Sequence, residues 1–462
     1  MTRTYTNSYP VGASGGYLSS YNTYYIFNRL LTSTVTDGTK STVFVTNTYD
    51  NGATTFRNQS GIQEHDSKMN TTWSPRGVVL TSTTPSANMT YQYDIAGNVT
   101  QTTRNGVQTT VTTNSGTNFA APSAITTNYT SSMTWSSFLG LSSATGPNGD
   151  TTGITYNGTG RPLTSSSPYG AVTNYTYNDT ASPPTRTATT NTHFVTTSLD
   201  GFGRTIQTDS GDTTSHSRVQ TQYAACGCSP LGKLYRQSEP YDPNANGGNP
   251  TIYWTTYTYD GSERTTYVTL PDNSVTGYSY SGNTVTVTDP AGNWKKFTMD
   301  AFGNLTQVVE PDATQTNTNG QATTTYTYDI LNHLIGVSMP RQTPGGSYTQ
   351  TRTFNYAAGN TVGAFLLSAA NPENGTVTYT YNTLGLVATK TDAKGQELKY
   401  VYDTYGRLLT VSLAGSPDTV LRTYTYDTNS VNTNYSQYAW GPVDHCDLQR
   451  SRDRAGVGSQ FE

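Results

Sequence analysis

The sequence predicts an all-β protein, in which an array of antiparallel β-hairpins pairs into one long, coiled sheet. The first observation is a short motif, Tyr-x-Tyr-Asp followed by x-x-Gly and then Arg or Asn, that recurs along most of the chain. The second is its spacing: Asn157, Asn178 and Asp200 occupy the same motif position and lie 21 and 22 residues apart. Such a repeat indicates that function depends on the shape of the array rather than on one pocket.

The Asp-x-x-Gly part of the motif predicts a tight hairpin turn. Its carboxylate can accept hydrogen bonds from backbone amides of the turn, and its Gly can adopt a positive φ at low cost. The clearest copies span residues 91–98 and 400–407, and weaker copies keep the Tyr pair but lose a turn residue. The residues to which we assign this structural role are Asp94, Gly97, Asp200, Gly203, Arg204, Asp260, Arg264, Asp300, Gly303, Asp329, Asp403, Gly406 and Arg407.

Strand-forming residues flank each turn. Tyr-Thr-Tyr alternates with period two, which places both Tyr side chains on one face and Thr on the other. A second strand such as residues 407–413 follows, and it ends at a looser turn such as Asp-Pro-Ala-Gly at 289–292. Each repeat of about 21 residues is therefore one hairpin. Because a lone hairpin is marginal in water, consecutive hairpins must pair edge to edge, and the resulting sheet twists and coils.

The composition favours a thin wall over a deep apolar core. Of the 462 residues, 33% are hydrophobic, 12% are charged and 36 are Tyr, with a net charge of −4. A disordered chain of low hydrophobicity would have few aromatic residues and a high net charge. Ladders of Tyr and Thr, at ~0.2–1 kcal/mol per cross-strand pair, can instead hold a sheet with two polar faces. The charge provides no basic patch, so we expect no nucleic-acid partner.

The chain contains no targeting or membrane signal. No apolar stretch approaches the length of a membrane span, and residues 1–5 lack the start of a signal peptide. A secreted or cell-surface location would therefore require another export route, or the chain is a fragment of a longer protein.

Few residues suggest chemistry. Cys226-Gly-Cys228, with His216 nearby, could be half of a metal site or a redox pair, but the spacing is unusual and no second pair exists. The alternative is a turn in an inserted segment, whose thiols are either free or oxidised. The recurring Asp residues could form a calcium or acid–base ladder, yet equivalents such as Asn157 and Asn382 suit a turn cap better. We therefore predict no catalytic residue, no metal and no cofactor.

The array is expected to have three parts. Residues 1–85 carry degenerate repeats of the same sheet, residues 86–438 form the main array with an insertion at about 209–252, and residues 439–462 form a disordered, non-repeat tail. After Tyr424-Thr-Tyr426-Asp427 no Gly-Arg follows, and we expect no second strand there. An open, aggregation-prone edge near residue 430 would result.

The Tyr-x-Tyr-Asp-x-x-Gly-Arg units over roughly residues 86–430 closely resemble the YD or RHS repeats of bacterial polymorphic toxins, wall-associated proteins, toxin-complex C components and teneurins. The resemblance implies a strip of sheet that spirals into a hollow cocoon around a C-terminal toxin. It also implies toxin cargo and secretion machinery as partners. Complete members close the shell with a core segment, and in many this segment contains an aspartyl self-cleavage site. This chain lacks the segment and looks like a truncated or partial member.

The function that we predict is structural: a non-enzymatic shell segment of a secreted or surface protein, encapsulating or presenting a C-terminal effector. The alternative is a cell-surface adhesin that binds a glycan through Tyr-rich sheet faces. An enzyme would require catalytic groups that converge from several repeats, and the sequence contains no such set.

Overall fold

The prediction of an all-β hairpin array is confirmed. The computed structural model describes residues 2–10, 25–51, 54–58, 61–62, 69–72, 74–312, 320–343, 346–356, 364–428, 430, 433, 441 and 443–448. Its strands form one sheet of 34 strands. Each strand pairs antiparallel with the next along the chain, from β1–β2 to β33–β34. The topology is therefore a single meander, interrupted within the described ranges by a small 3₁₀ turn and a short helix.

The elements of the first half are β1 (Thr4–Ser8), β2 (Thr32–Thr36), β3 (Ser41–Tyr49), β4 (Val79–Thr84), β5 (Ala87–Tyr93), β6 (Val99–Arg104), β7 (Val107–Thr113), η1 (Ser115–Thr117), β8 (Pro122–Thr126), β9 (Thr130–Trp135), β10 (Leu141–Thr145), β11 (Thr151–Tyr156), β12 (Pro162–Ser166), β13 (Val172–Asn178), β14 (Thr185–Thr190), β15 (His193–Leu199), β16 (Thr205–Gly211) and β17 (His216–Cys226). Those of the second half are β18 (Ser229–Ser238), α2 (Ala245–Gly248), β19 (Trp254–Tyr259), β20 (Thr265–Thr269), β21 (Val275–Ser281), β22 (Thr284–Thr288), β23 (Trp294–Met299), β24 (Leu305–Pro311), β25 (Gln321–Tyr328), β26 (Leu334–Thr343), β27 (Gly346–Asn355), β28 (Ser368–Asn371), β29 (Gly375–Tyr381), β30 (Val387–Thr391), β31 (Glu397–Tyr402), β32 (Leu408–Leu413), β33 (Thr419–Tyr426) and β34 (Val443–Leu448).

The tight turns bulge at the second Tyr of the motif. The register between β31 and β32 shifts between Val401 and Tyr402, and that between β19 and β20 shifts between Thr258 and Tyr259. A bulge of this kind accompanies a short hairpin loop with a left-handed residue, and it increases the local twist of the strands. The repeated bulge therefore contributes to the coiling of the sheet.

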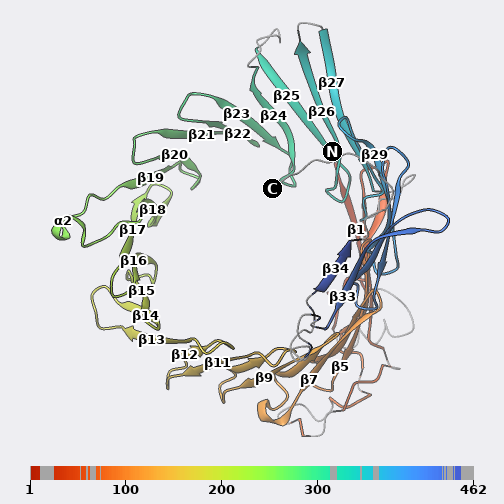
Figure 1. The fold of residues 1–462 in the computed structure, drawn as a ribbon, viewed down its shortest axis with the longest axis horizontal. Helices are drawn as coiled ribbons and strands as arrows, with labels where there is room; N and C mark the ends of the chain where they lie inside the picture. The colour runs from red at the N-terminus through yellow and green to blue at the C-terminus, as the bar shows by residue number, and fades with distance from the viewer. Residues whose placement is uncertain are drawn as a thin grey trace.

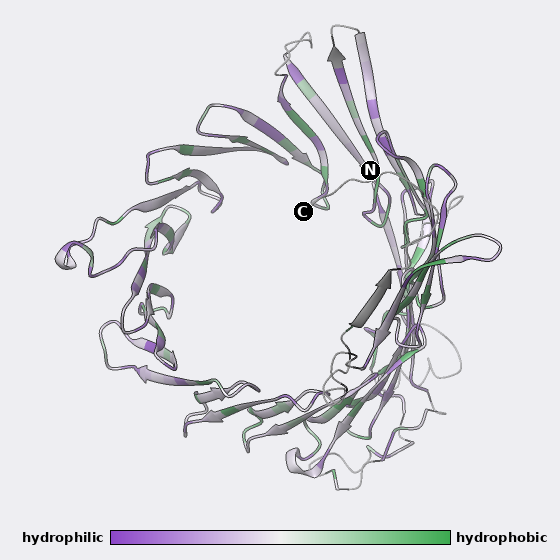
Figure 2. Cartoon of the chain, in the orientation of Figure 1, coloured by the Kyte–Doolittle hydropathy of each residue, from purple (hydrophilic) through white to green (hydrophobic). Residues whose placement is uncertain are grey.

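The sheet is a wall one layer thick over most of its length. The chain exposes 27,693 Å², whereas a compact protein of this mass would expose about 17,000 Å². Along β13 the side chains alternate between exposed and half-buried, with Tyr175 and Tyr177 on the half-buried face. Figure 2 shows apolar and polar residues interspersed along the strip rather than gathered in one core.

The strip coils through more than one full turn (Figure 1). The chain begins near β1, runs around an open ring through β9, β13 and β20, and returns so that β29–β34 lie beside the first strands. In a meander, alternate turns lie at opposite edges of the strip. The motif turns, which follow Tyr-x-Tyr, lie at one edge, here called the Asp edge. The turns that connect one repeat to the next, such as the two-residue turn Asn105-Gly106 between β6 and β7, lie at the opposite edge.

One expectation about the end of the array was wrong. We expected no second strand after Tyr426-Asp427, but β34 pairs with β33, with Tyr424 opposite Cys446 and Tyr426 opposite Val443. No sequence signal marked this strand, because the 13 residues between Asp427 and Gly441 contain no turn motif. The Gly441 amide nevertheless donates to the Asp427 carboxylate at 2.8 Å. Residues 449–462 lie outside the described residues.

Candidate functional site

The motif Asp carboxylates accept hydrogen bonds inside their own turns. Oδ1 of Asp403 accepts from the amides of Tyr405 and Arg407, each at 2.9 Å. The carboxylate oxygen is used in the same way at Asp94, Asp200, Asp260, Asp300 and Asp329. The side-chain oxygens of Asn157 and Asn382 make the same pair of bonds. A neutral amide can thus replace the carboxylate, so the turn needs an acceptor rather than a charge.

The residue three positions after the Asp has a left-handed backbone. Gly97, Gly203, Gly303 and Gly406 have φ between 78° and 89°. In weaker copies Glu263 (φ 65°) and Asn332 (φ 68°) take this conformation instead. The sequence variation at this position therefore changes the free energy needed to form the turn, but the backbone conformation stays the same.

Arginine at the end of the motif links two successive repeats. Arg264 donates from Nε to Oδ2 of Asp260 at 2.8 Å, and its guanidinium carbon lies 4.3 Å from the centre of the Tyr280 ring in the next repeat. Hydrogen bonding from Arg264 lowers the pKa of Asp260. The same arrangement joins Arg204 to Tyr223 and Arg407 to Tyr426, at 4.0 and 4.4 Å. A guanidinium above an aromatic face is attracted to the ring electrons, so each Arg holds neighbouring hairpins together.

The second Tyr of the motif makes a contact that the sequence did not reveal. The hydroxyl of Tyr402 donates to the carbonyl of Val387 in the preceding repeat, at 2.8 Å. Equivalent bonds of 2.8–2.9 Å run from Tyr156 to Leu141, Tyr177 to Pro162, Tyr280 to Thr265, Tyr381 to Leu366 and Tyr426 to Leu408. Trp135 makes the same link through Nε1 to Pro122, at 2.7 Å. The signal was present in the sequence, because a half-buried Tyr must find a partner for its hydroxyl.

The two turns of the spiral meet along a line that we call the seam. Its best-defined contact joins Tyr129, in the hairpin loop between β8 and β9, to Arg407 and Asp427, which belong to the second coil of the spiral. The Tyr129 hydroxyl donates to Oδ1 of Asp427 at 2.5 Å, and Nη1 of Arg407 donates to the Tyr129 hydroxyl at 3.0 Å. Arg407 also forms two bonds to the Asp427 carboxylate, at 2.8 and 2.9 Å. These bonds from Arg407 hold the pKa of Asp427 well below its usual range.

The seam continues at the start of the chain. Arg3 donates to Oδ1 of Asn332 at 2.7 Å and to the carbonyl of Asp329 at 2.8 Å, and its guanidinium lies 4.0 Å from the centre of the Phe302 ring. Nearby, Val35 and Ile330 form a small, fully buried apolar cluster. At each of these contacts a hairpin loop at the Asp edge of the later strands packs against strands β1–β9. The edge of β1–β9 that it contacts is the one opposite to their own Asp edge.

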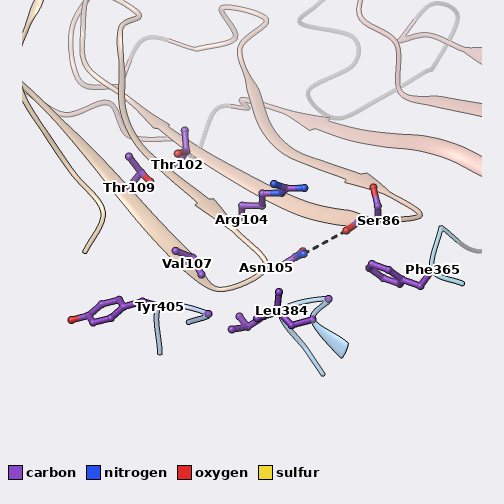
Figure 3. Close-up of a pocket in the computed structure, with 12 residues that line it drawn as sticks. Ser86, Thr102, Arg104, Asn105, Val107, Thr109, Phe365, Leu384 and Tyr405 are labelled. Atoms are coloured by element: carbon purple, nitrogen blue, oxygen red, sulfur yellow. Dashed lines mark hydrogen bonds between the residues drawn. The ribbon is translucent and has the colours of Figure 1, made fainter. Parts of the chain in front are cut away.

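A groove of about 500 Å³ opens along the middle of the seam (Figure 3). Asn105 and Arg104, from the turn between β6 and β7, line one wall, and Phe365, Leu384 and Tyr405 of the second turn line the other. Asn105 donates to the carbonyl of Ser86 at 3.5 Å, a bond within the first turn of the spiral. The groove therefore lies between two stacked edges and is open to solvent.

Comparison with known proteins identifies the type of repeat. The family model described as RHS Repeat matches residues 381–418, which contain Tyr381, Asp403, Gly406 and Arg407. Among solved structures the chain is similar to the crystal structure of TcdB2-TccC3, with a TM-score of 0.56 and 15% sequence identity. The match covers 76% of this chain and 21% of that chain. The chain therefore contains an RHS repeat.

Other solved structures resemble the RHS-repeat chain more weakly. A TcdB2-TccC3 crystal structure without the hypervariable C-terminal region has a TM-score of 0.40 at 13% identity, over 86% of this chain and 33% of that one. The Tc holotoxin pore of Photorhabdus luminescens has a TM-score of 0.27 at 14% identity, over 87% and 29%. No curated protein matches the sequence. The RHS-repeat chain spans about a fifth of the length of TcdB2-TccC3, and at 15% identity this likeness establishes the fold and nothing further.

The candidate metal ligands of the RHS-repeat chain do not come together. Within the described ranges, no group of three or more His, Cys, Asp or Glu side chains is positioned to hold a metal ion. Cys226 and Cys228 are joined in a disulfide, and Nε2 of His216 lies 3.6 Å from Oδ1 of Asp209, which also pairs with Arg218. A search of the same residues for a helix long and apolar enough to span a bilayer found none.

Proposed function

We propose that this RHS-repeat chain is a wall segment of a larger secreted or surface protein, and that the wall encapsulates or presents a C-terminal effector. The observation that carries the proposal is the seam. A curved strip without contacts between its coils would leave both edges open. Here the contacts of Tyr129 with Arg407 and Asp427 join one coil of the spiral to the next, and the two coils make a continuous wall. Contacts between residues 278–329 positions apart in the chain hold this stack.

The turn residues have a structural role in this proposal. Their carboxylates, guanidinium groups and Tyr hydroxyls bond to the hairpins themselves, so among the turn residues that the structure describes these groups are engaged in holding the wall together. The chain therefore works without catalysis and without a cofactor. Its partners are an effector on the inner side of the wall and the machinery that exports the whole protein.

The first experiment is small-angle scattering on the purified chain, with negative-stain microscopy of the same sample. A compact protein of 462 residues would have a radius of gyration of about 23 Å. We expect a clearly larger value and a ring-shaped particle. A solid particle near the compact value contradicts the wall.

Encapsulation needs a separate test. A small protease-sensitive domain fused after residue 448 is expected to resist digestion when the seam is intact. The seam variant described in the Discussion supplies the control, and equal digestion of both fusions would argue against an enclosing role.

The second candidate function is binding of a surface glycan. Exposed aromatic rings favour it, because Tyr169 is 94% exposed and Tyr267 and Tyr348 are about half exposed. Flat aromatic faces beside Thr and Asn side chains suit stacking on sugars. A glycan array probed with the labelled chain decides this, and binding that survives Tyr169→Ser, Tyr267→Ser and Tyr348→Ser together would rule out these rings.

A further inference from the structure

The Cys226–Cys228 disulfide lies at the tip of the hairpin formed by β17 and β18. Cys226 pairs in register with Ser229, so Gly227 and Cys228 are the two residues of the turn between β17 and β18. Both cysteines are half-exposed and Gly227 is exposed. The neighbouring Leu231 is 63% exposed, so this end of the hairpin faces solvent.

The disulfide adds little to the wall. The strand ladder already closes the hairpin, with Thr221 opposite Gln237 and Ala224 opposite Lys233. Arg204 also ties the hairpin to the preceding repeat by donating to the carbonyls of Leu231 and Gly232, at 2.8 and 3.1 Å. A crosslink stabilises a fold mainly by closing a loop of the unfolded chain, and a loop with one intervening residue is among the shortest possible.

We propose that Cys226 and Cys228 form a thiol–disulfide exchange site, whose reaction partner is a low-molecular-weight thiol of the glutathione class. Disulfides that are exposed and unnecessary for the fold are the ones that exchange readily. Because the ladder and Arg204 hold the hairpin in either state, the pair can open and close without disturbing the array.

The exchange consists of two steps. A thiolate attacks one sulfur of the pair, the Cys226–Cys228 bond breaks, and the departing thiolate takes a proton from water. A second thiolate attacks the mixed disulfide and releases the oxidised small molecule. The protein gains two electrons and two protons, and two small thiols are joined into one disulfide.

The test equilibrates the full chain, with Cys446→Ser to remove the third thiol, in buffers of varied reduced and oxidised glutathione. Samples are quenched with acid and alkylated, and free thiols are counted by intact mass. We expect zero thiols in oxidised glutathione and two in an excess of reduced glutathione, appearing together. Circular dichroism is expected to be unchanged between the two states.

Two single variants complete the design. Cys228→Ser and Cys226→Ser, each with Cys446→Ser, retain one thiol and are expected to capture one glutathione from its disulfide. Two outcomes overturn the proposal. One is a pair that stays oxidised in excess reduced glutathione until denaturant is added, and the other is single variants that capture no glutathione although they fold.

Discussion

Replacing Arg407 with Ala tests whether the seam holds the two spiral turns together. The substitution removes the bonds from Arg407 to Asp403 at 2.7 Å, to Asp427 at 2.8 and 2.9 Å, and to Tyr129 at 3.0 Å, together with the contact on Tyr426. Breaking a buried ion pair costs about 3–5 kcal/mol. Because the side chains of Arg407, Asp403 and Asp427 are 15–21% exposed, we expect a loss of about 2–4 kcal/mol.

Arg161→Ala is the matched control, because Arg161 occupies the same motif position without touching the seam. It pairs with Asp179, whose side chain is 60% exposed, and it lies above the ring of Tyr177 at 4.6 Å. An exposed ion pair contributes about 0–1 kcal/mol and an exposed cation–π contact about 0.5–1 kcal/mol. The control is therefore expected to lose clearly less stability than Arg407→Ala.

A repeat array can unfold in parts, so the assay must be local. Hydrogen exchange followed by mass spectrometry reports on the turn around Tyr129, which contacts Arg407 although 278 residues separate them. In Arg407→Ala we expect faster exchange in peptides over residues 122–135, and in Arg161→Ala no change there. Equal protection of these peptides in Arg407→Ala and the unaltered chain would refute the seam as an energetic contact.

Three further predictions concern the repeat itself. Tyr402→Phe removes one hydrogen bond to the preceding hairpin and is expected to lower the free energy of unfolding in urea by about 0.5–1.5 kcal/mol. Tyr400→Phe, which removes no such bond, is the control, and equal losses in the two variants would contradict the role of the Tyr402 hydroxyl. Gly203→Ala adds a Cβ to a residue with φ 78° where no other atom lies close, so the loss of stability comes from the backbone conformation alone. We expect thermal unfolding to show a loss of about 1–2 kcal/mol, with Gly201→Ala as the comparison. The pKa values of Asp260 and Asp300 are lower in the folded state than the unfolded value of about 4. Their contribution to the free energy of unfolding is therefore complete above about pH 4 and is lost as the pH falls through the folded-state pKa values. A urea midpoint that already drops between pH 7 and pH 5 would contradict this.

The sequence by itself determined the hairpin and its turn, because both depend on residues close together in the chain. Asp403 and Gly406 lie within one turn, so hydrogen-bond geometry and backbone freedom predict their conformations. The period near 21 residues likewise predicted one meander. The bond from Tyr402 to Val387 was within reach of the same reasoning, since the repeat places the two residues 15 positions apart.

Only the tertiary structure decided where the second spiral turn rests on the first. Tyr129 and Asp427 are 298 positions apart, and although Asp427 ends a copy of the Tyr-x-Tyr-Asp motif, no local pattern predicts its contact with Tyr129. Their meeting depends on the twist and bulge of every intervening strand, and a small change in each would accumulate over the ring. The strand β34 belongs with them, because it forms where β33 offers an unpaired edge rather than where its own sequence repeats the motif.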